Sequence, residues 1–409
     1  MNSVWEALIR TDENNISSVM TDCPQRDERM GWMNDATGRF GVSPYSFEVG
    51  RLYPKIIRDI QNEQRPEGCF TCCCPYYYGM LPADPCCSSF LVAAREYFMR
   101  TGDAGYVRSV MPDLERWEDY LLSRSKDYIV DYSWYGDWAG PSYACMGEEI
   151  PQNAYTDGLV VSTGFSLYNC LLLRELAEKT GLPAEKYRDN AEKIKNAMLS
   201  RWWDEEKASF AGGGMGAQAF ALWLGLIPKA KRAAAAENMA LELRRRRCRI
   251  TTGNQLTQPL MEMLFEYGYA DDAWEFLCRE EYPSFGYMLQ NEATTLWERY
   301  ELKKAPGMNS HSHPMHGNAL SVLYTRIAGL KPAAPGWKKV EIKPCLPEKL
   351  LSCSLAADTP RGMISVRWAK RFGKKILWAQ LPPGVSGTVA FEGAEKEITS
   401  GFHRFEAEI

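Results

Sequence analysis

The stretch TDCPQRDERMGWMND, residues 21–35, gathers carboxylates, guanidinium groups and one tryptophan into a short segment. Pro24 removes a backbone donor and Gly31 favours a bend, so residues 21–31 are predicted to form a loop. A loop can turn several carboxylates toward one point, and Trp32 would offer a flat apolar face on which a sugar ring can rest. Because charged runs on loops are common, composition alone favours a solvated charged turn.

A second cluster, residues 286–317, favours the functional interpretation. It contains Glu292, Trp297, Glu298 and three of the four histidines. Two carboxylates that face each other across a cleft are the minimal equipment for glycoside hydrolysis, since one protonates the departing oxygen and the other activates water or attacks. Glu28 and Glu298 are the pair of interest, and Glu292 is an alternative base. A fold must bring these distant residues together.

The chain between residues 2 and 328 has a helical pattern, with apolar residues recurring at three and four. FSLYNCLLLRELAEK is apolar almost all the way round, whereas the helix predicted from Pro183 has a single apolar stripe. Six helical hairpins are predicted: 2–16 with 40–64, 88–100 with 104–124, 158–180 with 183–202, 215–226 with 228–245, 253–268 with 270–281, and 293–303 with 315–328. Alternating wrapped and one-sided helices indicate an inner ring inside an outer ring, an (α/α)6 barrel. Its first and sixth hairpins would be neighbours.

The sequence pattern changes from helical to β-rich after GLKPAAPGW, residues 329–337. Short segments rich in β-formers follow, separated by Gly and Pro. We therefore predict a mainly α protein with two domains, a catalytic barrel over residues 1–330 and a small C-terminal β-sandwich over residues 331–409.

Charge and cysteine content limit the kinds of partner. The formal net charge is only −4, which favours a small or neutral ligand over nucleic acid or a membrane surface. No basic segment followed by an apolar one opens the chain, and its thirteen cysteines fit reduced thiols, so a cytoplasmic location is predicted. No cofactor is expected. Two weak metal alternatives exist, a CxxC zinc site at Cys69 and Cys72 and a cluster of His311, His313 and His316.

Five segments together resemble glycoside hydrolase family 78, the inverting alpha-L-rhamnosidases. They are DCPQRDERMGW followed by Asp35, YGDW (135–138), TTGNQLTQPLMEML (251–264), ATTLWERY (293–300) and MNSHSHPMHG (308–317). Their order also agrees with the family, and the likeness extends over the helical region into the C-terminal part. The resemblance implies an (α/α)6 catalytic barrel and an exo-acting enzyme that releases terminal rhamnose.

The resemblance also implies roles for individual residues. Glu28, in RDER, would be the general acid, and Glu298, in TTLWER, the general base. Asp22 and Asp35 would hydrogen-bond rhamnose hydroxyls, and Trp32 and Trp138 would line the sugar pocket. His313 would contact the sugar near the base. Arg26 would orient the loop at residues 21–31 that carries Glu28, the acid loop.

These roles carry physical expectations. Glu28 must keep its proton near neutral pH, so its pKa should be raised by burial against Trp32 and by neighbouring acids. Arg26 and Arg29 should then pair with Asp22 and Asp27 and leave Glu28 unpaired. An inverting mechanism needs room for water, with about 6.5–9.5 Å between the two carboxyl groups.

Departures from the family pattern keep other functions open. Cys87 and Ser89 stand where family members often have a tryptophan and an acid, so one aromatic wall could be missing and the enzyme could act on another neutral or deoxy sugar. Glu292 stands where glycine is usual. The chain also starts almost at the first barrel helix, without the β-domains that usually precede it. This favours a minimal enzyme, a fragment, or a carbohydrate-binding relative without turnover. The aglycone and the oligomeric state are not readable from the sequence.

Overall fold

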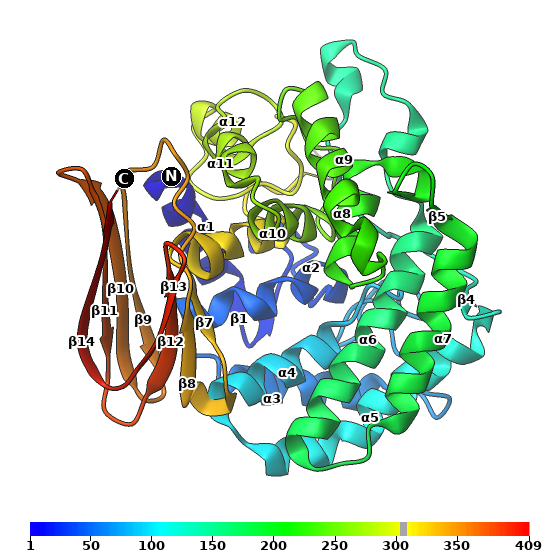
Figure 1. Cartoon of the computed structure of the whole chain (residues 1–409). Helices are drawn as coiled ribbons and strands as arrows, with labels where there is room; N and C mark the ends of the chain where they lie inside the picture. The colour runs from blue at the N-terminus through cyan, green and yellow to red at the C-terminus, as the bar shows by residue number, and fades with distance from the viewer. Residues whose placement is uncertain (303–308, 409) are drawn as a thin grey trace.

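The computed structural model describes residues 1–302 and 309–408. Lys303 of the last predicted hairpin, Met308 of the histidine motif and Ile409 lie outside these ranges. Helices form one large body and a pair of β-sheets lies against one side of it (Figure 1).

Six segments in succession build the inner ring. α4 (Ser89–Thr101), α6 (Gly158–Thr180), α8 (Met215–Trp223), α10 (Thr257–Glu266) and the 3-10 helix η7 (Met315–Ser321) each contact the next. The ring closes because η7 contacts the short 3-10 helix η1 (Arg39–Gly41), which in turn contacts α4. The closed ring confirms the predicted six-hairpin fold.

The outer helices each pack on an inner one, as expected from their one-sided patterns. They are α3 (Leu52–Glu63), α5 (Ala104–Ser123), α7 (Glu185–Trp202), α9 (Arg232–Arg245) and α11 (Ala270–Cys278). In α7 the buried residues are the predicted stripe of Tyr187, Ala191, Ile194 and Met198. α1 (Asn2–Asn15) packs on both α12 (Phe285–Gln290) and η7, so the start of the chain joins the end of the ring.

The prediction of a helix over 293–303 is wrong. Its backbone bonds instead to the stretch that follows, with Glu298 N–H donating to Ser310 O at 2.9 Å and His313 N–H donating to Leu296 O at 2.8 Å. The preceding α12 and the π-helical turn η8 (Leu323–Ile327) supply the helical structure at this end of the ring. Tertiary pairing overrides local propensity here.

The predicted helix over 40–64 is also shorter than expected. Its first part is broken into turns, including η1 and the 3-10 helix η2 (Ser43–Tyr45), in which Pro44 lacks a backbone donor. Before them, α2 (Met33–Thr37) follows the loop at residues 21–31 directly.

Two four-stranded sheets follow the helices. One has the order β14-β11-β10-β9 and is antiparallel, and the other has the order β13-β12-β8-β7 with β8 and β12 parallel. The strands are β7 (Leu330–Pro332), β8 (Lys339–Ile342), β9 (Ser352–Thr359), β10 (Gly362–Arg371), β11 (Lys374–Leu381), β12 (Ser386–Phe391), β13 (Ala394–Ile398) and β14 (Gly401–Glu408). Trp368 from β10 is fully buried and donates to Ile327 O at 2.7 Å, which ties the sheets to the last helical turn.

The helical part of the chain also contains three two-stranded hairpins. They are β1 (Ile16–Ser17) with β2 (Val19–Met20), β3 (Ser125–Lys126) with β4 (Ile129–Val130), and β5 (Trp203–Asp204) with β6 (Ser209–Phe210). Across the described ranges, no helix has the length and apolar run that crossing a membrane requires.

Candidate active site

The loop at residues 21–31 closes on itself, as the sequence predicted. Asp22 N–H donates to Met30 O at 3.0 Å, and Met30 N–H donates to Asp22 Oδ1 at 2.8 Å. Gly31 passes so close to the neighbouring strand that a Cβ there would lie 2.3 Å from Cys74 O. The segment is therefore a built loop held against the body of the protein, not a solvated turn.

Glu28 projects from this loop and contacts two other side chains. Trp32 Nε1 donates to Glu28 Oε1 at 2.8 Å, and Arg26 lies 2.9 Å from Glu28 Oε2. Burial raises the pKa of Glu28, and the charges of Asp22 and Glu298 raise it further, while Arg26 and the Trp32 hydrogen bond lower it. The predicted direction is confirmed, and it favours a protonated carboxyl.

Glu298 lies on the opposite segment and is nearly buried. Ser310 N–H donates to its Oε2 at 2.8 Å, and Arg26 donates to the same oxygen at 3.1 Å. Its backbone carbonyl contacts His316 Nε2 at 3.0 Å. Both donors lie on Oε2, and no described residue donates to Oε1.

Arg26 bridges the two glutamates, which differs from the expected pairing. Arg29 does pair with Asp27, at 3.7 Å in solvent, but Arg26 contacts Glu28 and Glu298 instead of Asp22. The closed loop uses Asp22 Oδ1 to bind its own backbone, so Asp22 takes no part in that pairing.

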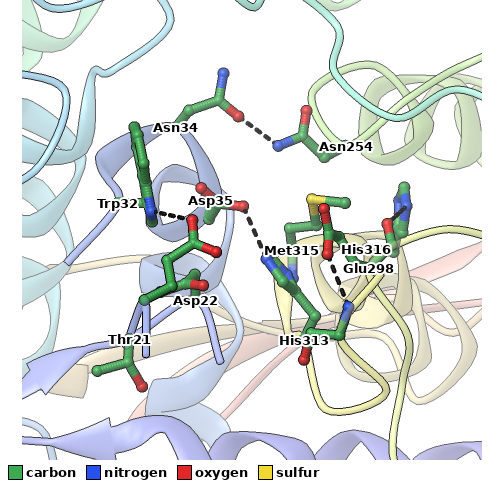
Figure 2. A network of polar contacts seen from close by, with 12 residues as sticks. Thr21, Asp22, Trp32, Asn34, Asp35, Asn254, Glu298, His313, Met315 and His316 are labelled. Carbon is green, nitrogen blue, oxygen red and sulfur yellow. Dashed lines mark hydrogen bonds and ion pairs between the residues drawn. The ribbon is translucent and has the colours of Figure 1, made fainter. Parts of the chain in front are cut away.

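Both glutamates line one hollow of the protein. The lining residues are Glu28, Trp32, Asn34, Asp35, Tyr135, Trp138, Glu298 and His313. In Figure 2, Trp32, Asp35, His313 and Glu298 come from two facing segments and converge on this space. Six of the eight predicted site residues therefore meet here: Glu28, Trp32, Asp35, Trp138, Glu298 and His313. Asp22 and Arg26 belong to the loop at residues 21–31 and are not among the lining residues.

Asp35 and His313 face each other across the hollow, with Asp35 Oδ1 3.5 Å from His313 Nε2 (Figure 2). Burial raises the pKa of Asp35 well above its usual range, helped by the charges of Asp22 and Glu298. Burial likewise lowers the pKa of His313 well below its usual range. Both shifts disfavour the charged forms, and each side chain can hydrogen-bond a sugar hydroxyl.

The remaining walls are aromatic. Trp138 packs edge-on against Tyr135, with ring centroids 5.8 Å apart, and Tyr135 packs edge-on against Trp32 at 5.9 Å. The Arg299 guanidinium lies 5.3 Å from the Trp138 ring centre. Three aromatic rings thus form one continuous side of the hollow.

The YGDW loop is fastened to the start of α10 by Asp137. Asp137 Oδ1 accepts from Gln255 N–H at 3.0 Å and Leu256 N–H at 2.9 Å, and its Oδ2 accepts from Gly253 N–H at 2.7 Å. Burial raises the pKa of Asp137 to about 6. A carboxylate at a helix start satisfies donors that the helix leaves unpaired. Asp137 thereby positions Trp138.

Three groups near the site were not predicted from the sequence. Asn34 and Tyr135 line the hollow, and Asn34 Oδ1 also accepts from Asn254 Nδ2 at 2.5 Å, which links two loops (Figure 2). Asp84 is fully buried and its Oδ2 accepts from Tyr135 N–H at 2.6 Å. Asn34 lies in the segment 21–35 and Tyr135 in the YGDW motif. Their closeness in sequence to Asp35 and Trp138 could have indicated that they line the same site.

Two sequence alternatives do not fit the geometry. Glu292 is exposed and lies outside the lining of the hollow, which argues against its role as the base. Cys87 and Ser89 are fully buried, and Ser89 Oγ donates to Met33 O at 2.6 Å. Neither lines the hollow, so the expected loss of an aromatic wall is not seen.

Metal-ligand geometry is found at one place within the described residues, at Asp22, Cys23 and Glu28. Burial raises the pKa of the Cys23 thiol to about 12, and thiolate is the form that binds metals. Glu28 already contacts Arg26 and Trp32. His311 stacks on Trp297 and His316 packs on Tyr300, so they do not gather with His313.

The family models agree with this site and fold. Residues 1–327 match the model described as the bacterial alpha-L-rhamnosidase 6 hairpin glycosidase domain, and residues 329–406 match the bacterial alpha-L-rhamnosidase C-terminal domain. The chain belongs to the bacterial alpha-L-rhamnosidase family. This confirms the membership predicted from the motifs.

Curated alpha-L-rhamnosidases are similar over most of the chain. The one from Streptomyces avermitilis is 26% identical and covers 99% of this chain, and the one from an Alteromonas species is 29% identical and covers 90%. The chain spans 41% of the length of each of these relatives.

Solved alpha-L-rhamnosidases have the same fold. The enzyme from Dictyoglumus thermophilum superimposes with a TM-score of 0.92 at 27% identity, over 100% of this chain and 49% of that one. The Streptomyces avermitilis enzyme, solved in complex with L-rhamnose, gives a TM-score of 0.91 at 26% identity, over 100% of this chain and 41% of that one.

Proposed function

We propose that this chain carries the catalytic centre of an inverting, exo-acting alpha-L-rhamnosidase that releases terminal rhamnose, with Glu28 as general acid and Glu298 as general base. The observation that supports it most is the meeting of these two glutamates on one hollow in a member of this family. In the same proposal residues 1–330 are the catalytic barrel, residues 331–409 are the β-sandwich domain, and the enzyme acts in the cytoplasm.

The two glutamates are equipped for different work. Glu28 has the raised pKa that an acid needs in order to protonate the departing oxygen. Glu298 receives its donors on Oε2, so Oε1 is available to take a proton from water. Arg26 contacts both glutamates and so helps to hold the two carboxylates in position relative to each other.

The distance between them is compatible with inversion. One guanidinium touches both carboxylates, at 2.9 and 3.1 Å, so the contacting oxygens lie no more than about 8 Å apart. This limit includes part of the ~6.5–9.5 Å that an inverting pair spans around a water, and also the ~5–5.5 Å of a retaining pair. The family resemblance supplies the choice of inversion over retention.

The walls suit a 6-deoxy sugar. The rings of Trp32, Tyr135 and Trp138 offer an apolar side for the methyl group and the sugar ring. Asp35 and His313 line the hollow and offer hydrogen bonds to ring hydroxyls.

Proton NMR of the anomeric signal during hydrolysis of an aryl alpha-L-rhamnoside tests activity and stereochemistry together. We expect β-L-rhamnose to appear first and to mutarotate afterwards. First appearance of the α-anomer would refute inversion. A panel of nitrophenyl glycosides checks the sugar, and turnover of another glycoside with none of the rhamnoside would refute the substrate. Rhamnose binding without any hydrolysis would instead support the non-catalytic alternative.

A further inference from the structure

A second hollow adjoins the candidate active site. Glu28 lines both hollows, and the second is also lined by Arg29, Pro75 and Tyr77. The two spaces therefore share the carboxyl group that the proposed function makes the general acid.

The far wall of this second hollow belongs to an aromatic loop, residues 75–79. Its three consecutive tyrosines are unusually open for large aromatic side chains, since Tyr76 is 53%, Tyr77 79% and Tyr78 66% exposed. Exposed apolar surface grouped in this way is characteristic of binding sites.

Backbone bonds hold the aromatic loop to the body of the protein on both sides. Cys72 N–H donates to Met80 O at 3.0 Å across its base, and Cys74 N–H donates to Gly31 O at 3.1 Å, which ties it to the acid loop. Tyr76 N–H donates to Glu63 Oε1 at 3.0 Å. The backbone that carries the tyrosines is thus held beside the loop that carries Glu28.

The aromatic loop also touches the sugar hollow. Tyr78 packs edge-on against Trp32, with ring centroids 6.4 Å apart, and Trp32 is the residue that donates to Glu28. A Cβ on Gly79 would lie 3.2 Å from the Trp32 ring, so the loop follows the back of this wall closely.

The direction of the reaction places the leaving group in this second hollow. A general acid protonates the oxygen that joins the sugar to its leaving group, so that oxygen must lie within reach of Glu28. With the sugar in the first hollow, whatever is bonded to the oxygen continues past Glu28 toward Tyr77. A flat ring there can stack on tyrosine, while Arg29 at the rim can meet its polar substituents.

We propose that Tyr77 and Tyr78, with Arg29 at the rim, form the leaving-group site and that it selects flat aromatic aglycones. This inference rests on the proposed function, because Glu28 as acid sets the direction. It assigns the substrate class to aryl rhamnosides in preference to rhamnosyl oligosaccharides.

Calorimetric binding of 2-naphthyl and methyl alpha-L-rhamnoside tests it, with full-length protein carrying Glu298→Gln to prevent turnover. We expect the naphthyl compound to bind about tenfold more tightly, and Tyr77→Ala or Tyr78→Ala to reduce that preference about threefold. Tyr77→Phe should retain it, because the ring remains. The control Phe372→Ala removes an aromatic residue that is 91% exposed elsewhere and should also retain it.

The outcomes separate the two proposals. Equal binding of the two rhamnosides, or a preference that survives both alanine substitutions, would refute the aromatic leaving-group site while leaving the rhamnosidase intact. Binding of neither rhamnoside would overturn the proposed function, and this inference with it. A preference lost in Phe372→Ala as well would also count against the assignment, since that side chain is remote from both hollows.

Discussion

Replacing Glu28 by glutamine should lower turnover in a way that depends on the leaving group. The variant keeps a carbonyl oxygen that can accept from Trp32 Nε1, a bond of 2.8 Å in the native protein. It loses the ion pair between Glu28 and Arg26. These two side chains are 26% and 28% exposed, and such a pair contributes under about 1 kcal/mol to the free energy of unfolding. The structural cost is therefore small.

The catalytic cost is much larger. General acid assistance contributes about 10²- to 10⁴-fold, or roughly 3–5.5 kcal/mol of barrier. This loss should be seen with methyl rhamnoside, whose alkoxide cannot leave without a proton. It should be nearly absent with 2,4-dinitrophenyl rhamnoside, whose leaving group departs as a stable anion. The difference between the two substrates therefore isolates proton donation from any damage to the fold.

The assay is kcat/KM for both substrates, with thermal unfolding to check the fold. Glu292→Gln is the matched control, because Glu292 is an exposed carboxylate outside the lining of the hollow. We expect it to behave like the native protein. An equal loss on both substrates in Glu28→Gln would refute the acid role, and so would an unchanged rate on methyl rhamnoside.

Three further predictions concern the rest of the site. Glu298→Gln should slow both substrates by about 10²-fold or more in kcat, since water must be activated whichever group leaves; a loss on only one substrate would contradict the base role. Trp32→Phe removes the hydrogen bond that lowers the pKa of Glu28, so that pKa should rise further. Because the acid acts protonated, the fall of kcat/KM at high pH should move to higher pH. A fall at unchanged pH would argue against this coupling. Asp137→Ala leaves three backbone donors without an acceptor and should cost about 3–4 kcal/mol of unfolding free energy by urea titration, whereas the exposed control Asp131→Ala should cost under about 1 kcal/mol; similar midpoints for the two variants would show that Asp137 does not fasten the loop.

The local sequence was informative where a residue's role depends on its type and near neighbours. The apolar stripe of α7 and the all-round apolar surface of α6 identified outer and inner helices, because the 3.6-residue period is a local property. Pro24 and Gly31 likewise predicted a loop from their own backbone preferences. The motif around Glu28 was long enough to predict the family.

Tertiary structure decided which charges pair and which backbone groups bond. Arg26 was expected beside Asp22, but ring closure brings it to Glu298, which lies 272 positions along the chain and which no local pattern reveals as a neighbour. The stretch around Glu298 has helical propensity, yet its donors bond to the segment that follows. The sequence by itself determined the helical periods, the loop and the chemical types at the site, because these depend on residues close in the chain. Only the closed ring decided their partners and burial, because ion pairing and desolvation depend on distances in space.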